Sequence, residues 1–503
     1  MVRNALANVA SGASAALLAI VLPPVLVRAL SAEVYATWAL ILQIGAYTAL
    51  LNFGIQTAVG RFVARYDETG ETGRRDELVS TAWAVLSASA AAGILAMLLL
   101  SAFLPEFFPR IPAAVRREAQ GSLAWVGTSL ALGLPFSVFM GIFIGRQSNG
   151  IPAVIQVVSR LATGVGIYLV CIFSPTLLSM AKVFAGVNFC TYAFQYLVHR
   201  RWNGDCDIRP GLAGRSAWAD LWDYCFSLTV WSLASLMVSG LSLVIVGRLD
   251  FGAVAAFAIA SGLVTFISGL QGAVFNVLIP VGAVLQVDTD GDRLRRMLLN
   301  STRYGVLLLL ASGLPLFVFG DFLLKYYVGP KWIPQTLPLL QLLVVGNLIR
   351  LSAVPYVSLL IGTGQQRLVI ASPLLEGFTN LLSSVFLGLR FGARGVAVGT
   401  ILGAVVGLVF HILYNFPRTD QIPARAGRFV REGLLLPLVP ALPWAAWVFR
   451  DRILPSGGSA AFPLFLAVAG STLYLLWKFV LRREEHEALA GFLRRRGQGA
   501  DRA

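Results

Sequence analysis

The sequence predicts an all-α integral membrane protein with about fourteen transmembrane helices, as its composition and the lengths of its apolar runs indicate. Of its 503 residues, 57% are hydrophobic and only 13% are charged, whereas soluble domains carry about 25% charged residues. The apolar residues form continuous runs of about 18 to 25 residues, each long enough to cross about 30 Å of hydrocarbon as a helix. Because these runs do not alternate apolar and polar residues, they exclude a membrane β-barrel.

The apolar runs are expected to cross the membrane at fourteen places. They lie near residues 8–28, 34–58, 79–103, 121–145, 151–173, 176–198, 223–247, 252–280, 298–320, 336–361, 368–389, 395–415, 432–449 and 461–481. An even number of crossings places both termini on the same side of the membrane.

Lys and Arg residues are distributed unequally between the two sides. The segments on the side of the termini hold more than twice as many of them as the opposite loops, and such an excess marks the cytoplasmic side. We therefore expect both termini in the cytoplasm. The net charge of +15 is attributed to these segments, and no nucleic-acid partner is expected.

Four short patterns recur in the same order at one spacing. Asp67–Glu71 recurs as Asp288–Asp292, Pro135 as Pro355, Gly145–Gln147 as Gly364–Gln366, and Pro152 as Pro373, at offsets of 219 to 221 residues. The copies are separated by six helices, an even number, so both halves have the same orientation. A parallel repeat of this kind is a transporter design in which the substrate path runs between two lobes.

The repeat sets the expected domain organisation. Residues 1–215 are expected to form a first six-helix lobe and residues 216–430 a second one. Residues 431–503 lie outside the repeat and hold the last two helices and a basic tail, in which Leu481–Arg496 reads as a helix on the inner leaflet or as a solvated segment.

Two features of single helices have both a packing and a functional interpretation. Pro135 and Pro355 are hinge candidates because they repeat, although membrane helices tolerate proline more than soluble ones. Helix 12 carries glycines on one face, and packing against a neighbouring backbone is favoured over a ligand contact. These glycines are Gly395, Gly399, Gly403 and Gly407.

Several segments resemble those of a known family. Leu30–Trp38, Leu51–Gly54 and Arg61–Ala64 look like the opening of the polysaccharide-transporter family, and Val328–Trp332, Gly362–Arg367 and Phe391–Gly395 look like its segments around helices 10 to 12. That family includes the flippases of O-antigen and other lipid-linked oligosaccharides, within the multidrug/oligosaccharidyl-lipid/polysaccharide exporter superfamily. The resemblance covers essentially the whole chain.

The resemblance implies a MATE-like two-lobed fold that carries a lipid-linked glycan from the cytoplasmic to the outer leaflet. It places the protein in the bacterial cytoplasmic (inner) membrane, in the biosynthesis of surface polysaccharide such as O-antigen or exopolysaccharide. The implied partners are a lipid-linked oligosaccharide with an anionic diphosphate, membrane lipid and the glycan polymerase machinery.

Ionisable residues inside a bilayer cost roughly 2.5–3.5 kcal/mol on insertion scales and usually face a cavity. Arg160, Lys182, Arg303 and Arg350 lie within expected helices, whereas Glu376 is the one acid placed among them. The surplus of positive charge predicts a cationic lumen, which suits a diphosphate.

Other interpretations of these charges stay open. Lys182 and Arg303 are close enough to their helix ends to extend toward the interface. Glu376 either neutralises an arginine or carries a coupling ion, H⁺ or Na⁺.

No enzyme or cofactor site is indicated. The sequence has no P-loop and no GxSxG motif, and its three histidines are scattered. Asp288–Asp290 resembles a metal–nucleotide-sugar motif, but its short loop carries no nucleotide-binding fold. Its four cysteines include no CxxC pair and suggest neither a disulfide framework nor a zinc site. No metal or cofactor is therefore expected.

The sequence leaves four candidate functions for the protein. A flippase for a polyprenyl-diphosphate oligosaccharide is favoured. A cation-coupled drug exporter of the same superfamily would need more acids in its lobes, and a peptidoglycan-precursor flippase would by resemblance carry arginines deep in its first two helices. A glycan polymerase or ligase would need a sizeable outer loop, which the sequence lacks.

Overall fold

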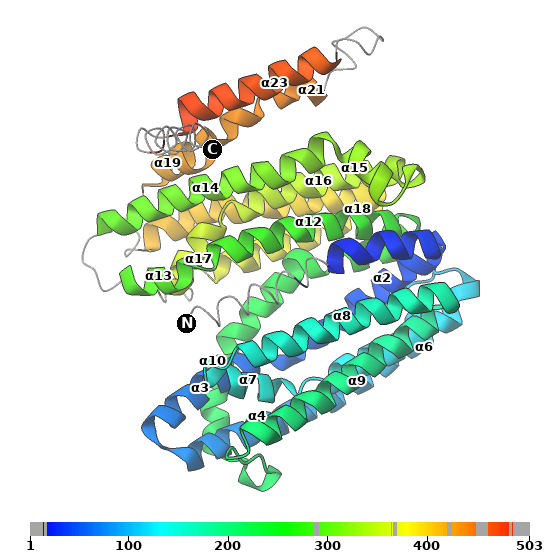
Figure 1. Ribbon diagram of the computed structural model, residues 1–503, viewed down its shortest axis with the longest axis vertical. Coiled ribbons are helices and arrows are strands. Elements are labelled where there is room, and N and C mark those ends of the chain that lie inside the picture. The colour runs from blue at the N-terminus through cyan, green and yellow to red at the C-terminus, as the bar shows by residue number, and fades with distance from the viewer. Residues whose placement is uncertain are drawn as a thin grey trace, which may run out of the picture. The chain divides into compact units, whose positions relative to one another are not determined.

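The computed structural model describes residues 14, 18–285, 291–363, 365, 370–419, 425–448, 461–481 and 485. Every regular element in these ranges is a helix (Figure 1). Ten of the described helices are long and apolar enough to cross a membrane, and a bent pair adds an eleventh. The chain is therefore a multi-pass membrane protein.

The count of fourteen crossings stays a prediction, for three reasons that lie in individual segments. The first expected crossing is described as the short apolar helix Leu18–Ala29, the two expected crossings at 368–389 and 395–415 form one long element, and the region of the thirteenth is divided into short helices.

The second expected span is broken near its middle. α2 (Ala32–Ala46) continues into a 3₁₀ turn (Tyr47–Asn52) and then into α3 (Ile55–Thr69). Between the turn and α3, Phe53 and Gly54 both have positive φ angles, of 51° and 75°. Two successive left-handed residues end one helix and re-aim the next, so α3 is a separate half-span.

Four long helices between residues 72 and 202 lie side by side (Figure 1). They are α4 (Thr72–Ala102), α6 (Ala113–Leu132), α8 (Gly150–Phe173) and α9 (Leu177–Trp202). The short α5 (Leu104–Phe107) follows α4, and α7 (Ser137–Gly145) continues the span of α6 after a break.

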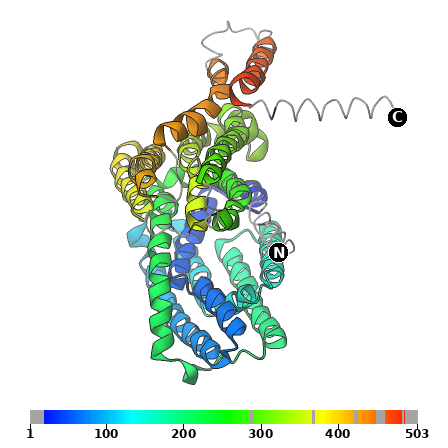
Figure 2. The same ribbon diagram turned by 90° about the vertical axis from the view of Figure 1, so that its left-hand side faces the viewer.

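The seventh expected span is also broken. α10 (Arg215–Ser235) leads through a π-helical turn (Leu236–Gly240) into α11 (Ser242–Leu249), and the two helices are bent by 42°. Figure 2 shows α10 in green beside the blue helices α3 and α4. Its Leu221 and Cys225 belong to a buried core together with Val59 of α3 and Leu86 of α4. α10 therefore packs against α3 and α4.

The next helices alternate between long and short elements. They are α12 (Val254–Phe275), α13 (Leu278–Leu285), α14 (Gly291–Val318), α15 (Gly320–Tyr327), α16 (Ile333–Leu351) and α17 (Val354–Gly362).

α18 (Ala371–Phe410) is a hairpin of two helices that meet at Gly392, whose φ is 60° and ψ −142°. The glycine face predicted in helix 12 packs directly on the preceding helix. A Cβ on Gly399 would lie 2.5 Å from the backbone nitrogen of Ser384, and one on Gly403 would lie 2.7 Å from the Cβ of Asn380. The prediction that this face serves packing is confirmed.

The C-terminal part consists of shorter elements. They are a π turn at His411–Asn415, α19 (Ala426–Arg428), a π turn at Phe429–Leu435, α20 (Leu436–Leu438), α21 (Trp444–Val448), α23 (Ala461–Leu475) and a π turn at Leu476–Val480. Three prolines at 437, 440 and 443 explain the division before α21, because each removes a backbone donor.

By contact, the chain divides into two compact units. The first comprises residues 1–273, 324–347 and 369–407, and the second comprises residues 274–323, 348–368 and 408–503. These units group halves of helices, so the lobes expected at 1–215 and 216–430 stay a proposal. The repeat motifs at 288–290, Gly364 and Gln366, and most of the basic tail, lie outside the described residues.

Candidate functional site

The half-spans α3 and α7 form a tightly packed pair. Gly60 of α3 faces Gly141 and Gly145 of α7. A Cβ on Gly145 would lie 2.5 Å from the carbonyl oxygen of Gly60, and one on Gly141 would lie 2.7 Å from that of Gln56. Only glycine permits this approach, so the two half-helices are held backbone to backbone.

The same pair recurs in the other unit. α13 packs on α17, and Gly362 faces Gly282: a Cβ on Gly362 would collide with the carbonyl oxygen of Ile279 and would lie 3.2 Å from the Cα of Gly282. Gly282 follows Gly60 by 222 residues and Gly362 follows Gly141 by 221. The sequence repeat thus has a structural counterpart, in which each copy contains one glycine-packed pair of half-helices.

Both hinge candidates lie where a span is broken. Pro135 lies between the end of α6 at Leu132 and the start of α7 at Ser137, and Pro355 lies in the first turn of α17, directly after the break that ends α16. Proline cannot donate a backbone hydrogen bond, which accounts for both breaks. Whether the spans bend there during transport stays a proposal.

The break at Pro135 is supported by α9. The hydroxyl of Tyr192 donates to the carbonyl oxygen of Ser129 at 3.1 Å, and the Tyr192 ring stacks on Phe136 at 5.2 Å. Ser129 precedes the break by one turn, so Tyr192 satisfies a carbonyl where the helix ladder is interrupted.

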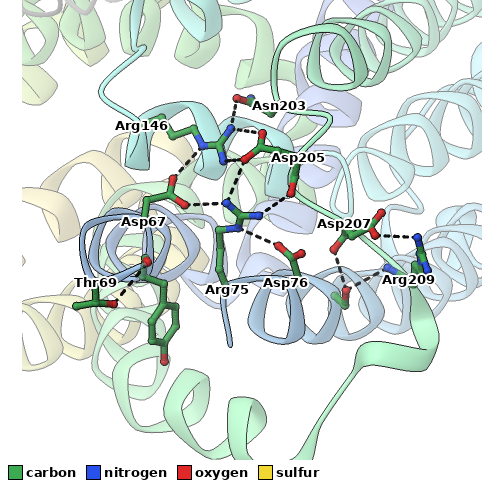
Figure 3. Close-up of polar contacts among 11 residues, drawn as sticks. Asp67, Thr69, Arg75, Asp76, Arg146, Asn203, Asp205, Asp207 and Arg209 are labelled. Atoms are coloured by element: carbon green, nitrogen blue, oxygen red, sulfur yellow. Dashed lines mark hydrogen bonds and ion pairs between the residues drawn. The ribbon is translucent and has the colours of Figure 1, made fainter. Parts of the chain in front are cut away.

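An ionic network connects α3, α4, the end of α7 and the segment after α9 (Figure 3). Arg146, directly after α7, donates from Nε to Asp67 of α3 at 2.9 Å and from Nη1 to Asn203 after α9 at 2.8 Å. Its Nη2 reaches Asp205 at 2.5 Å. Arg75 of α4 donates to the same Asp67 and Asp205 at 2.9 and 3.1 Å.

The two arginines of this network are enclosed. The Arg75 side chain is 3% exposed and that of Arg146 is 20% exposed. The hydrogen bond from Arg146 lowers the pKa of Asp205 from its ordinary 3.8 to about 2. Asp205 is therefore ionised at neutral pH, and its ion pairs connect α3, α4, α7 and the segment after α9.

A second polar cluster surrounds the π turn of the seventh span. The amide of Asn380 donates to the carbonyl oxygens of Met237 and Val238, at 3.1 and 2.5 Å. From α2 and its 3₁₀ turn, Gln43 and Tyr47 donate to the carbonyl oxygen of Gly240, at 3.0 and 2.7 Å. No sequence signal marks this cluster, because its side chains are uncharged and the π turn carries no proline.

Glu376 lies one turn from this cluster in the hairpin α18. Its side chain is buried, and a Cβ on Gly407 would lie 2.6 Å from Glu376 Oε2. Glu376 and Asn380 are four residues apart and therefore share a helix face. The structure thus places the ion-coupling candidate next to polar groups that the sequence did not single out.

The expected cations take different positions. Arg160 of α8 is half-buried and donates to Ser14 at 3.1 Å and to Gln156 at 3.4 Å. Lys182 of α9 is exposed, and Arg350 is half-buried in the last turn of α16, beside the break before Pro355. Arg160 and Lys182 belong to the first compact unit, and Arg350 belongs to the second.

Arg303 of α14 has a different environment. It is 3% exposed, and its Nη1 donates to the carbonyl oxygen of Val480 at 3.1 Å. Its Nη2 donates to Glu485 and to the hydroxyl of Tyr304. In this conformation Arg303 faces the last span and the segment after it. Lining of a path by any of the four cations stays a proposal.

Among the described residues, no group of three or more His, Cys, Asp or Glu side chains is arranged to hold a metal ion. The polar clusters are instead built from ion pairs and from hydrogen bonds to backbone carbonyls. Both kinds of contact hold helix halves in place.

Comparison with known proteins identifies one family by sequence. The family described as "Polysaccharide biosynthesis protein" matches residues 1–286, more than half of the chain. No curated protein matches the chain in sequence.

Solved structures share the fold. The lipid II flippase MurJ in an inward closed conformation is 14% identical, with a TM-score of 0.69 over 93% of this chain and 97% of the other. An inward-facing multidrug resistance MATE transporter of the MOP superfamily is 14% identical, with a TM-score of 0.64 over 83% and 95%. A MOP-superfamily transporter from Pyrococcus furiosus is 14% identical, with a TM-score of 0.54 over 81% and 94%. These likenesses confirm the predicted fold class.

Proposed function

The chain belongs to the polysaccharide biosynthesis protein family, and from this membership we propose that it is a flippase for a polyprenyl-diphosphate-linked oligosaccharide. The lipid-linked glycan moves from the cytoplasmic to the outer leaflet of the bacterial cytoplasmic membrane, for surface polysaccharide such as O-antigen or exopolysaccharide. The relatives in fold are transporters and flippases, which agrees with a protein that moves its substrate unchanged.

The observation that carries the proposal is the duplicated pair of half-helices. Gly60 with Gly141 and Gly282 with Gly362 hold α3 to α7 and α13 to α17, and each pair follows a proline-associated break in a span. Each pair of half-helices can therefore move as a rigid body about the break that separates it from the rest of its span. Two such bodies related by the repeat support alternating access from the two sides of the membrane.

The diphosphate is proposed to meet cations along the path. Arg160 and Arg350 are the strongest candidates, because both are half-buried and Arg350 lies beside a break. Lys182 is a weaker one because it is exposed. A guanidinium binds phosphate oxygens through two parallel donors, so Arg suits this role better than Lys.

Transport is proposed to be coupled to H⁺ or Na⁺ through Glu376. Glu376 is buried and lies one turn from Asn380, whose amide nitrogen donates to two carbonyls of the π turn; a carboxylate is an oxygen ligand that a small cation favours. Binding or release of the ion there would bear directly on the bend between α10 and α11.

The test is surface glycan production in bacterial cells that lack the native gene. Charge-assisted contacts contribute about 1.5–3 kcal/mol, so Arg160→Ala and Arg350→Ala should each lower export about tenfold or more at normal membrane levels. The matching lysine variants should recover part of it. The control is Arg209→Ala, an exposed position. Normal export by both alanine variants contradicts the cationic path.

The second candidate is a cation-coupled exporter of small molecules, and the buried Glu376 favours it as well. Drug resistance of cells expressing the protein separates the two functions. If the protein is a flippase, cells that express it gain no drug resistance. The Glu376→Gln variant should then lose glycan export, and the Glu33→Gln variant, changed at an exposed position, should retain it. Resistance without glycan export supports the exporter, and rescue of cells depleted of their lipid II flippase supports the peptidoglycan-precursor alternative.

A further inference from the structure

An apolar cavity lies in the second unit, between α14 and the C-terminal helices. Its volume is about 370 Å³. Leu307 and Leu314 of α14 line one side together with Phe319, directly after α14, and Trp444 and Leu476 line the other. An apolar cavity excludes water and takes apolar ligands, so its natural occupant is a hydrocarbon chain.

The dimensions of the cavity suit an extended chain. Leu307 and Val318, which both line the cavity, are eleven residues apart on α14, which corresponds to about 17 Å along a helix. If a carbon atom takes roughly the 30 Å³ share of a water molecule, the volume holds roughly a dozen carbon atoms. That is about two isoprene units of a polyprenyl chain.

A buried cation, Arg303, lies about one helical turn from one end of the cavity lining. Arg303 precedes Leu307 by four residues on α14, and Val480 follows Leu476 by four residues on the last span. The hydrogen bond from Arg303 Nη1 to the Val480 carbonyl, 3.1 Å long, therefore joins these two helices about one turn beyond the cavity lining.

Arg303 is bound to groups that a phosphate could replace. Its Nη2 donates to the carboxylate of Glu485, which also accepts from the Tyr304 hydroxyl, while its buried Nε has no hydrogen-bond partner among the residues that the structure describes. A buried guanidinium needs a counter-ion, and a diphosphate offers more oxygens than a carboxylate to the same fork of donors.

We propose that the cavity and Arg303 form one binding site for a polyprenyl diphosphate. The chain lies in the cavity, the phosphate oxygens bind Arg303, and Glu485 occupies Arg303 when the lipid is absent. The choice of lipid rests on the proposed function. In the predicted orientation α14 begins at the cytoplasmic side, so the Arg303 end is nearer the inner leaflet, where the lipid-linked glycan begins its passage.

The experiment measures lipid binding to the purified full-length protein in nanodiscs of neutral lipid. The probes are a polyprenyl diphosphate, phosphatidylglycerol and inorganic pyrophosphate. The polyprenyl diphosphate should bind at least tenfold more tightly than either other probe, because only it offers both the chain and the diphosphate. Equal binding of phosphatidylglycerol indicates a general anionic-lipid site, and equal binding of pyrophosphate indicates that the cavity plays no part; both results overturn the proposal.

The variants test each part of the site. Glu485→Gln removes the competing carboxylate and should tighten binding several-fold. Ala311→Trp fills the cavity and should weaken binding tenfold or more, although Arg303 is intact. The double variant Arg303→Gln with Glu485→Gln removes the ion pair without leaving one charge buried, and should lose the preference for diphosphate. Arg209→Ala is the control. Unchanged binding in Ala311→Trp or in the double variant overturns the site.

Failure of this site and failure of the proposed function give different results. If the purified protein binds the lipid as described but cells export no glycan, the site stands and the function is wrong. If Ala311→Trp and the double variant export glycan normally and bind lipid normally, the site is wrong and the function stands.

Discussion

Arg146 and Asp67 join the C-terminal ends of the half-helices α7 and α3, with Nε of the arginine 2.9 Å from Oδ2 of the aspartate. At the other end of the same pair, Asn52 donates to Ser137 at 2.8 Å. Between these contacts the backbones of α3 and α7 approach through glycine. The pair is therefore fixed at both ends and along its length.

Arg146→Gln should destabilise the protein by about 1.5 kcal/mol, the lower end of the range for charged hydrogen bonds, because Asp205, one of its two carboxylate partners, is 59% exposed. Glutamine is the informative replacement, because Gln365 stands at the equivalent place in the second repeat. Thermal unfolding in detergent measures the effect. Arg209→Ala is the control, since its ion pair with Asp207 is exposed and contributes at most about 1 kcal/mol. Equal unfolding temperatures for the two variants would show that the network is dispensable.

The network should persist in mild acid. The pKa of Asp205 is lowered to about 2 from an ordinary 3.8, so its stabilising effect is complete above the higher value and is lost as pH falls through the lower one. Asp205→Asn should therefore reduce stability at pH 7 and remove the part of the acid sensitivity that appears below about pH 4. Unfolding curves collected across this range test the sign, and a loss of the Asp205 contribution already between pH 7 and 5 contradicts it.

Pro135→Ala and Pro355→Ala should slow transport. Alanine restores a backbone donor and favours a continuous helix by about 3 kcal/mol, which opposes bending at the break. We expect glycan export to fall tenfold or more at normal membrane levels. Pro338→Ala is the matched control, because Pro338 lies within the uninterrupted α16. If all three variants export alike, the two breaks are static features of the fold.

Gly395→Ala should loosen the hairpin of α18. Its Cβ would collide with the carbonyl oxygen of Leu387, and overpacking of this kind costs about 1–3 kcal/mol. Gly186→Ala in α9 is the control, because no atom of the described residues lies within 4 Å of its added Cβ. There the gain in helix propensity should be neutral or stabilising by about 0.5–1 kcal/mol. Thermal unfolding of both variants decides the comparison.

Most of the fold could be predicted because hydrophobic length and glycine spacing are local signals. The apolar runs indicated the spans, and the spacing of four between Gly395 and Gly399 indicated a packing face. The break at Pro135 was signalled by the missing donor of that residue. The break at Phe53 had no such signal, because a positive φ at phenylalanine depends on the packing around it.

The polar sites were harder to predict because their members come from distant segments. Asp67 and Arg146 were noted only as repeat markers, and Asp205 was not singled out. Nothing in the sequence indicates that these three meet. Arg303 was expected to line a path, yet Glu485, its partner in this conformation, is 182 residues away. Uncharged Asn380 gave no signal, because only its contact with the π turn distinguishes it from other amides.

The hairpin of α18 also bears on how the protein is made. Its first helix carries Glu376, Asn380 and Ser384, which would be costly to release singly from the translocon into lipid. The second helix presents glycine to these residues, so the two helices shield them only when they enter the bilayer together. We therefore expect the ribosome to complete both before either is released laterally. A nascent chain that stops between them would be left with polar atoms facing lipid, a state that membrane quality control recognises.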